Sequence, residues 1–398
     1  MTDNWPMTRR QILKFGTTSI AAAGVASCRS LLPSSLDNPN DDEVDSNSSR
    51  AIIPSSCVPL EPSCPLKDQA ASRGLIYGAA SKYQTLSSDP EFADVFSTEC
   101  ALLVPENDFK WLAMRPGLHQ FDFTRSDWMA DFAEANNLLL RGHTLVWYKS
   151  LPRWFEKEVN VTNAEAVMLD HIRTVGNRYA GRVHSWDVVN EAIASNPTIE
   201  DPWQPSPWLD WVGTDYIAKA FHAAHEVDPE ARLVYNENGL WWDAPEGEAK
   251  KSAVLRLLEN LKTQGVPIHA LGIQSHLRGH LMDQFQPEKM RQFLQNVADL
   301  ELEIYISELD VRETELPDDI EERDRLVAGI YTDYLSVILE QPAVSTVVTW
   351  GLSDRDTWHS KFGRKDQARP LPLDRELNRK PAWSAIANSF RNAPPHSF

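Results

Sequence analysis

Eight short apolar runs alternate with amphipathic stretches along most of the chain, and this alternation constrains the fold more than any other feature. The runs begin at Gly74, Cys100, Leu138, Val183, Ala231, His269, Glu303 and Ser345. Successive starts lie 26 to 48 residues apart, which leaves room for one helix and two loops each time. Strands that alternate with helices form parallel sheets, and eight such units close into a barrel. We therefore predict an α/β fold of the (β/α)8 TIM-barrel type; an open doubly wound sheet is the alternative, although nothing in the sequence matches its usual Gly-rich phosphate turn.

The stretches between the runs carry the periodicity and the end signals of helices. Thr162 and Glu165 form a capping-box pattern at the start of one stretch, and Gly181 stands at its predicted end. In another stretch an apolar stripe at helical spacing is followed by a stop at Gly265. The stripe comprises Val254, Leu257, Leu258 and Leu261.

Residues 1–28 resemble an export signal rather than a part of the fold. A paired Arg9-Arg10 precedes a weakly apolar run, which is the pattern of the twin-arginine export route. That run is too short to span a bilayer as a helix. The segment ends at Cys28 in a pattern that resembles a lipobox, in which the cysteine becomes the lipidated N-terminus; an ordinary cleavage site is the alternative. We expect export to the periplasm or the cell surface, with Cys28 as a membrane tether.

Composition divides the rest of the chain into a linker and one domain. Residues 29–70 are rich in Ser, Pro, Asn and Asp and cannot bury enough apolar surface to fold, so we predict a flexible linker. Residues 71–398 are uniform in character, which predicts a single domain. Cys57 and Cys64 are spaced for a short disulfide loop in an exported protein, and the sequence leaves their pairing open. Cys100 starts a predicted strand, so we expect a buried free thiol there.

The charge and the tryptophan content narrow the class of ligand. A net charge of −18 argues against a nucleic-acid partner, which requires clustered Lys and Arg. The 14 tryptophans are several times the usual share, and flat indole faces cover the C–H surfaces of sugars. Five of them occupy predicted loops as either sugar platforms or loop packing: Trp203, Trp208, Trp211, Trp241 and Trp242. A neutral ligand suits this composition, and a monomer is our expectation.

Acids, amides, histidines and tryptophans stand where most of the predicted strands end. They are Glu106 and Asn107, His143 and Trp147, Asn190 and Glu191, Asn236 and Glu237, Gln274 and His276, Glu308 and Asp310, and Trp350. In a barrel the carboxyl ends of the strands meet at one rim, where active sites form. The sequence therefore predicts a rim site for a hydroxyl-rich ligand.

Two of these acids can act as a catalytic pair. Glu191 and Glu308 follow the fourth and seventh runs, which lie on opposite sides of an eight-stranded ring. The alternation Ile304, Ile306, Glu308 places all three on one face, which we expect to point inward. Two carboxyl groups that flank a glycosidic bond are the minimum for its hydrolysis: one protonates the leaving oxygen and the other attacks carbon or activates water. His276 and Asp310 are placed to bond to Glu308 and fix its orientation.

The motifs around these acids resemble those of the glycoside hydrolase family 10 endo-β-1,4-xylanases, a retaining (β/α)8-barrel family, over residues 75–392. "WDVVNEA" matches the acid/base motif of that family, which implies that Glu191 is the acid/base and that Asn190 contacts the sugar 2-hydroxyl. "ISELDV" matches the nucleophile motif, which implies that Glu308 is the nucleophile and Asp310 its support. Other matching segments imply a place for His276 among the catalytic residues and sugar-binding roles for Glu106, Asn107, Lys110, His143, Trp147, Gln274, Trp350 and Trp358. The resemblance implies xylan or xylo-oligosaccharides as the partner, double displacement as the mechanism, and neither a metal nor an organic cofactor.

The chain departs from the family pattern near the predicted substrate subsites. Tyr148 stands where the family has His, and Ser150 stands where it has Gln. The fifth strand ends with Asn238 in place of an aromatic residue beside the aglycone side. Ser150 and Asn238 leave open a retaining glycosidase for another β-glycan or short oligosaccharides. A third reading is a tethered carbohydrate-binding lipoprotein without turnover, although binding alone needs no acid/base pair such as Glu191 and Glu308.

Overall fold

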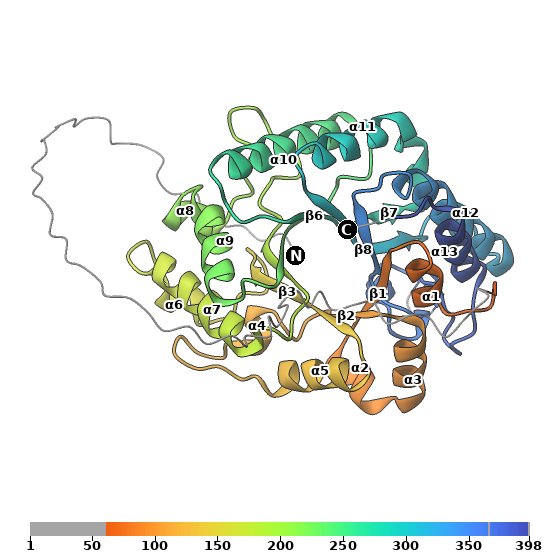
Figure 1. Ribbon diagram of the computed structural model, residues 1–398, viewed down its shortest axis with the longest axis horizontal. Coiled ribbons are helices and arrows are strands. Elements are labelled where there is room, and N and C mark those ends of the chain that lie inside the picture. The colour runs from red at the N-terminus through yellow and green to blue at the C-terminus, as the bar shows by residue number, and fades with distance from the viewer. Residues whose placement is uncertain (1–60, 365–366, 397–398) are drawn as a thin grey trace, which may run out of the picture. The chain divides into compact units, whose positions relative to one another are not determined.

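A computed structural model describes residues 61–364 and 367–396, and its centre is a closed parallel barrel (Figure 1). β6 pairs in parallel with β8 as well as with β5, and this contact closes the eight barrel strands into a ring. The predicted barrel is confirmed, and the open doubly wound alternative is wrong. The barrel strands are β1 (Ile76–Ser81), β2 (Leu102–Pro105), β3 (Leu139–Val146), β4 (Ser185–Asn190), β5 (Arg232–Glu237), β6 (Ala270–Ile273), β8 (Glu303–Arg312) and β9 (Val344–Thr349).

A ninth, short strand extends one side of the barrel. β7 (His276–Arg278) pairs with the distal half of β8, in the register His276 with Asp310 and Arg278 with Arg312. β8 is the longest strand because it serves both the barrel and this extension. The seventh and eighth predicted strands therefore correspond to β8 and β9.

Helices surround the barrel (Figure 1). The α-helices are α1 (Leu66–Ala71), α2 (Tyr83–Ser88), α3 (Pro90–Glu99), α4 (Trp111–Met114), α5 (Thr124–Ala135), α6 (Phe155–Glu158), α7 (Ala164–Tyr179), α8 (Pro207–Val212), α9 (Tyr216–Val227), α10 (Pro245–Thr263), α11 (Pro287–Ala298), α12 (Ile320–Ile338) and α13 (Pro381–Asn392). The 3-10 segments are η1 (Gly279–Gln284), η2 (Asp354–Asp356) and η3 (Trp358–Lys361). None of the helices within the described ranges is long and apolar enough to cross a membrane.

Two of the helix ends that the sequence predicted are confirmed, and one is wrong. The predicted stripe of α10 is buried, and Gly265 after it has a φ of +70°, a left-handed turn that favours glycine. Gly181, just after α7, has a φ of +72°. The capping box at the start of α7 is wrong, because the N-cap is Asn163 and Glu165 pairs instead with Lys219 of α9 at 2.7 Å. The long-range ion pair replaces the local contact that the pattern indicated.

The folded domain begins earlier than the predicted boundary at residue 71. Leu66 and Ala70 of α1 are buried, and the Leu66 amide donates to Glu99 Oε2 at 2.9 Å. Trp383 of α13 donates to the same carboxylate oxygen at 3.0 Å, so Glu99 joins α1, α3 and α13 at one corner. The linker assignment for residues 29–70 is therefore wrong at its end, because α1 is part of the packed domain.

Several sequence predictions fall outside the described residues. The export signal, Cys28 and Cys57 all lie within residues 1–60, so the tether and the pairing of Cys57 with Cys64 stay predictions. Cys64 is buried. Cys100 is a buried free thiol, as predicted.

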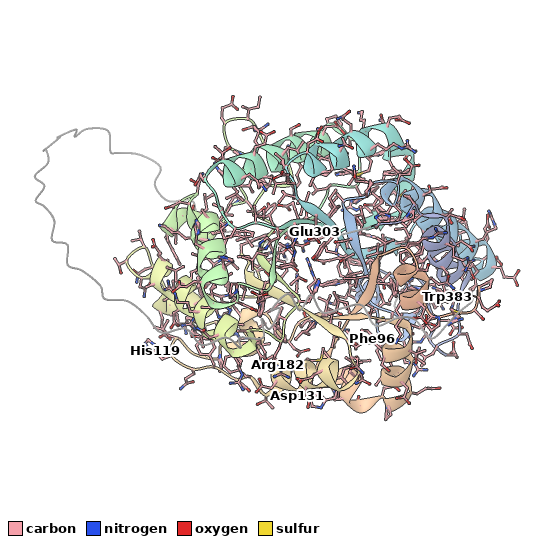
Figure 2. All side chains as sticks on the ribbon, viewed as in Figure 1. Phe96, His119, Asp131, Arg182, Glu303 and Trp383 are labelled. Carbon is pink, nitrogen blue, oxygen red and sulfur yellow. The ribbon has the colours of Figure 1, made fainter. Side chains whose placement is uncertain are left out.

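Two layers of side chains pack against the strands, one inside the barrel and one beneath the helices. Ala80, Val104 and Val348 come from three neighbouring strands and pack together in the interior layer. At the amino-terminal end of the barrel, Glu303 of β8 pairs with Arg232 of β5 and accepts from Ser345 Oγ at 2.9 Å (Figure 2). This ion pair lies at the end of the barrel opposite to the predicted site.

We expect the side-chain layer between the barrel and the helices to have no room for an added methyl group at Gly142, where β3 contacts β4. A Cβ at Gly142 would lie 2.1 Å from the ring of the buried Trp186. Gly142→Ala should therefore lower the free energy of unfolding by about 1 to 3 kcal/mol, as measured by urea denaturation. Gly329→Ala is the matched control, because Gly329 lies within α12 and nothing lies within 4 Å of its added Cβ. This variant should raise the free energy of unfolding by about 0.5 to 1 kcal/mol. Equal stability of the two variants would contradict this account of the Trp186 contact.

Candidate active site

A cleft of about 640 Å³ opens at the carboxyl ends of the strands. The predicted site residues that line it are Glu106, Asn107, Lys110, His143, Trp147, Asn190, Glu191, Gln274, His276, Glu308, Trp350 and Trp358. Asp310 is fully buried behind His276 and Trp358 and contacts both side chains. The structure therefore brings every predicted catalytic and sugar-binding side chain to one place.

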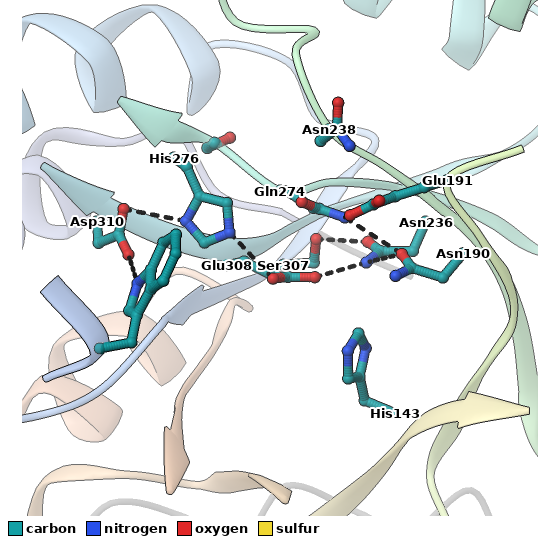
Figure 3. A network of polar contacts seen from close by, with 12 residues as sticks. His143, Asn190, Glu191, Asn236, Asn238, Gln274, His276, Ser307, Glu308 and Asp310 are labelled. Carbon is teal, nitrogen blue, oxygen red and sulfur yellow. Dashed lines mark hydrogen bonds and ion pairs between the residues drawn. The ribbon is translucent and has the colours of Figure 1, made fainter. Parts of the chain in front are cut away.

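Glu308 is held by one bond to each carboxylate oxygen (Figure 3). Asn236 Nδ2 donates to its Oε1 at 2.8 Å, and His276 Nε2 donates to its Oε2 at 3.1 Å. Only 4% of Glu308 is exposed. A buried carboxylate with both oxygens paired has one orientation, which a nucleophile requires.

The Glu308 side chain points inward, as predicted, but the predicted reason for this direction is wrong. Ile304 and Ile306 belong to the layer beneath the helices, whereas Tyr305 packs in the interior with Val234. Ser307 Oγ nevertheless donates to Asn236 Oδ1 at 2.6 Å, so two consecutive residues of β8 reach the same interior side chain. Regular strand alternation forbids this. The register between β8 and β9 shifts between Ile306 and Leu309, and this irregularity turns Glu308 inward.

His276 is clamped between two carboxylates. Its Nδ1 lies 3.0 Å from Asp310 Oδ1 and its Nε2 lies 3.1 Å from Glu308 Oε2, so both ring nitrogens donate and the ring is an imidazolium. Burial lowers the pKa of His276, but the charge of Asp310 and the two hydrogen bonds outweigh burial and raise the pKa to about 10. Trp358 Nε1 donates to Asp310 Oδ2 at 2.7 Å. Burial also raises the pKa of Asp310, but His276 and His359 hold it well below its usual range.

Glu191 has a more varied environment than Glu308. Gln274 Nε2 donates to its Oε1 at 3.1 Å, while Trp147 Nε1 and Lys149 Nζ lie 3.1 and 3.3 Å from its Oε2. Burial raises the pKa of Glu191, but the charge of Lys149 and the bonds from Gln274 and Trp147 bring the pKa below its ordinary value. The φ of Glu191 is +58°, a conformation that costs a non-glycine residue about 1 to 2 kcal/mol. This turn lets Glu191 follow Asn190 into the cleft.

A chain of amide side chains joins the two glutamates (Figure 3). Asn190 Oδ1 accepts from Gln274 at 3.2 Å and from Asn236 at 3.0 Å. Gln274 also donates to Glu191, and Asn236 also donates to Glu308. Asn190 Nδ2 donates to no other group in the described part of the chain, which leaves this donor for a ligand hydroxyl in the cleft.

His143 and Trp350 form the floor of the cleft. His143 Nδ1 lies 2.8 Å from Asp187 Oδ2, and Asp187 in turn pairs with the buried Arg141 inside the barrel. His143 packs edge to face on Trp350, with 5.2 Å between ring centroids. Because Asp187 fixes the ring through Nδ1, Nε2 remains for a ligand.

Lys110 projects over the cleft from the loop after β2. Its Nζ lies 5.3 Å from the centroid of the Trp147 ring and donates to Asn107 Oδ1 at 3.2 Å. Asn107 Nδ2 donates to Glu106 Oε1 at 3.1 Å, and Lys82 lies 3.8 Å from the other oxygen of Glu106. This group offers an alternating set of donors and acceptors to ring hydroxyls.

Sequence reasoning missed two residues that contact the glutamates. Asn236 was noted as a strand end without a role, although it directly opposes Asn190 in the β4–β5 register. No sequence pattern indicates a role for Lys149, because the residues on either side of it, Tyr148 and Ser150, both differ from the family pattern. Neither of those two residues lines the cleft, whereas Lys149 does.

The loop after β5 rests on a buried ion pair. Glu237 is fully buried, with Lys250 Nζ at 2.9 Å and the Ile193 amide donating to it at 3.0 Å. Lys250 also donates to Asn238 Oδ1 at 2.8 Å. Glu237 thus anchors the loop that follows Glu191, which is a structural role.

The five loop tryptophans divide between the two predicted roles. Trp241 and Trp242 line the cleft. Trp208 is buried and donates to the Trp147 carbonyl at 2.9 Å, so it is loop packing that supports a cleft residue. Trp203 and Trp211 pack partly buried against the main core.

The arrangement suits acid and nucleophile chemistry on a glycosidic bond, which is an acetal. It offers two buried carboxylates of different environment, joined by amides and flanked by indole rings. In the described ranges, no group of three or more His, Cys, Asp or Glu side chains is placed to hold a metal ion.

Comparison with known proteins gives a consistent set of relatives. The sequence profile of glycosyl hydrolase family 10 matches residues 65–389. Endo-1,4-beta-xylanase B of Thermotoga neapolitana is 32% identical over 313 residues, covering 78% of this chain and 86% of that protein. Beta-1,4-xylanase of Dictyoglomus thermophilum is 35% identical over 295 residues, covering 71% and 80%. Among solved structures, native xylanase 10B from Thermotoga maritima superposes with a TM-score of 0.74 at 32% identity, covering 82% of this chain and 98% of that one. Xylanase 10B from Thermotoga petrophila RKU-1 in complex with xylobiose also gives 0.74 at 32% identity, covering 82% and 97%.

Proposed function

The chain belongs to glycosyl hydrolase family 10, and from this premise we propose that it is an endo-1,4-β-xylanase that cleaves internal β-1,4-xylosidic bonds of xylan with retention of configuration. The observation that carries the proposal is the joined pair of buried carboxylates, Glu191 and Glu308, in a cleft lined by sugar-binding types of side chain. The relatives named above as xylanases supply the substrate class. One chain supplies the whole lining of the cleft, so the proposed reaction requires no second subunit.

The reaction is a double displacement. Glu308 attacks the anomeric carbon while Glu191 gives a proton to the departing oxygen; water activated by Glu191 then releases the sugar from Glu308. His276, held as an imidazolium by Asp310, balances the charge of the free Glu308 carboxylate. The free Nδ2 of Asn190 donates to the sugar 2-hydroxyl, a bond that strengthens in the transition state.

Lys149 has to leave Glu191 before the first step. An ammonium 3.3 Å from Oε2 favours the ionised form of Glu191, whereas the acid must carry a proton. About half of the Lys149 side chain is exposed, and it lies on a loop, so a sugar bound beside Glu191 can displace it into water. Neutralisation of Glu308 in the covalent intermediate then lets Glu191 lose its proton and act as base.

The N-terminal segment supports a proposal about location. The paired Arg9-Arg10 and the motif ending at Cys28 support export by the twin-arginine route and anchoring of the enzyme at the periplasmic or outer surface of a membrane through lipidated Cys28. Substrate of high molecular mass lies outside the cell, which suits an exported enzyme.

We expect the purified protein to release reducing ends from glucuronoxylan and arabinoxylan but not from mixed-linkage glucan or soluble cellulose. Glu308→Gln should lower kcat by roughly 10⁴-fold or more, because it removes the nucleophile. Glu259→Gln, on the exposed face of α10, makes the same chemical change and should leave activity intact. Proton NMR at early times should show the β-anomer as first product. Release mainly from the glucans would give the chain a different substrate, an α-anomer would contradict retention, and xylan binding without turnover would leave a carbohydrate-binding protein.

The pH dependence of kcat/KM should reveal the contact between Lys149 and Glu191. Because Lys149 lowers the pKa of Glu191, Lys149→Met should raise that pKa and move the alkaline limb of the profile to higher pH. Lys149→Arg keeps the cation and should leave the limb in place. If the alkaline limbs of the wild type and Lys149→Met superimpose, either Glu191 does not govern that limb or Lys149 does not change the pKa of Glu191.

Cell fractionation should test the proposed anchor. The full chain should appear in the membrane fraction, and Cys28→Ala should move it to the soluble exported fraction, because one lipidation site is removed. Replacing Arg9-Arg10 with two lysines should retain the precursor inside the cell. Membrane association that survives Cys28→Ala would contradict the lipid anchor.

A further inference from the structure

The cleft carries a charge opposite to that of the protein. The chain has a net charge of −18. The charged side chains that line the cleft, histidines aside, are Lys110, Lys149, Lys250, Arg278, Arg312 and Lys361 against Glu106, Glu191 and Glu308. Six cations against three acids in one concavity raise the local potential, and low-dielectric walls concentrate such a field.

Three of these cations already have partners in the site described above. Lys110 bonds to Asn107, Lys149 to Glu191, and Lys250 to Glu237. The proposed reaction gives no role to the other three, which are Arg278, Arg312 and Lys361.

Those three residues form one wall of the cleft, here called the basic wall. Arg278 at the end of β7 and Arg312 at the end of β8 are direct register partners. The Arg312 guanidinium lies 4.7 Å over the ring of Phe362, which follows Lys361 in the chain. The ends of two neighbouring strands and the end of η3 thus place three cations at the cleft, with Phe362 packed against Arg312.

The basic wall is short of negative partners. Arg312 Nη2 lies 3.5 Å from Glu315 Oε1, and Glu315 Oε2 is also 3.2 Å from His280. Within the described ranges no carboxylate comes within ion-pair distance of Arg278 or Lys361, and both are exposed. Like charges on directly opposed strand residues destabilise a sheet, so an anion that binds between them would be favoured.

We propose that the basic wall binds the carboxylate of an acidic sugar side chain, such as a uronic acid, carried on the xylan backbone. This inference rests on the proposed xylanase function and names the decorated substrate that the cleft prefers. Arginine donates in the fork geometry that a carboxylate matches, and the contact with the Phe362 ring orients the Arg312 guanidinium. Charges more than about one Debye length away, roughly 8 Å, are largely screened, so an acidic side-chain sugar at the wall interacts mainly with these cations and only weakly with the remaining charge of a protein of net charge −18.

The test compares two substrates that differ only in the carboxylate. One is glucuronoxylan, and the other is the same polymer after chemical reduction of its uronic acids to neutral sugars. We expect the wild-type enzyme to show a higher kcat/KM on the native polymer. In the double variant Arg278→Gln and Lys361→Gln that preference should fall about three- to tenfold, the size expected for two exposed charge contacts.

The control removes the same charge elsewhere. Arg256 on α10 and Arg325 on α12 are exposed and do not line the cleft, so the double variant Arg256→Gln and Arg325→Gln should keep the wild-type preference. Added salt provides a second measurement that needs no variant, because 0.5 M NaCl should reduce the wild-type preference by screening an exposed ion pair.

The outcomes separate this inference from the proposed function. A preference for native glucuronoxylan that is unchanged by both the basic-wall variant and salt would overturn the basic-wall proposal while leaving the xylanase function intact. Equal loss in the basic-wall and control variants would overturn it as well, because net charge alone would then explain the effect. A wild-type enzyme inactive on both polymers would overturn the proposed function and this inference together.

Discussion

The site depends on a chain of three amides that joins its two carboxylates. Gln274, Asn190 and Asn236 connect Glu191 to Glu308 through hydrogen bonds of 2.8 to 3.2 Å. Each amide is buried: Gln274 donates, Asn190 accepts and Asn236 does both, so none of them can turn without leaving a polar group unpaired at a cost of about 1 to 3 kcal/mol. The distance and the angle between the carboxylates therefore follow from the barrel strands that carry these amides.

The two glutamates differ because each faces a cation of a different kind. His276 is held on both ring nitrogens, and its partner Asp310 is itself fixed by Trp358, so the cation beside Glu308 is permanent at neutral pH. Lys149 beside Glu191 is a half-exposed side chain on a loop. A fixed cation suits a group that must stay ionised, and a displaceable one suits a group that must gain and lose a proton.

Much of the architecture could be predicted because it rests on local patterns. The buried runs, the stripe of α10 and the glycine after α7 all express periodicity or backbone preference within a few residues. The errors arose where a distant partner decides. Glu165 bonds to a neighbouring helix and not to its own helix start. α1 is ordered because its Leu66 amide bonds to Glu99, which also accepts from Trp383 of α13. Asn236 gained a role only through its register with Asn190.

By itself the sequence determined which chemical groups the rim would carry, because strand ends are readable from apolar periodicity and the carboxylates follow them directly. Only the tertiary structure decided which way those groups point. The register shifts after Asp187 in β4 and after Ile306 in β8, together with the positive φ of Glu191, make the side chains of consecutive residues point into the same cleft. Their physical cause is closure of the barrel: each strand must bond to two neighbours at once, and no stretch of a single strand contains that constraint.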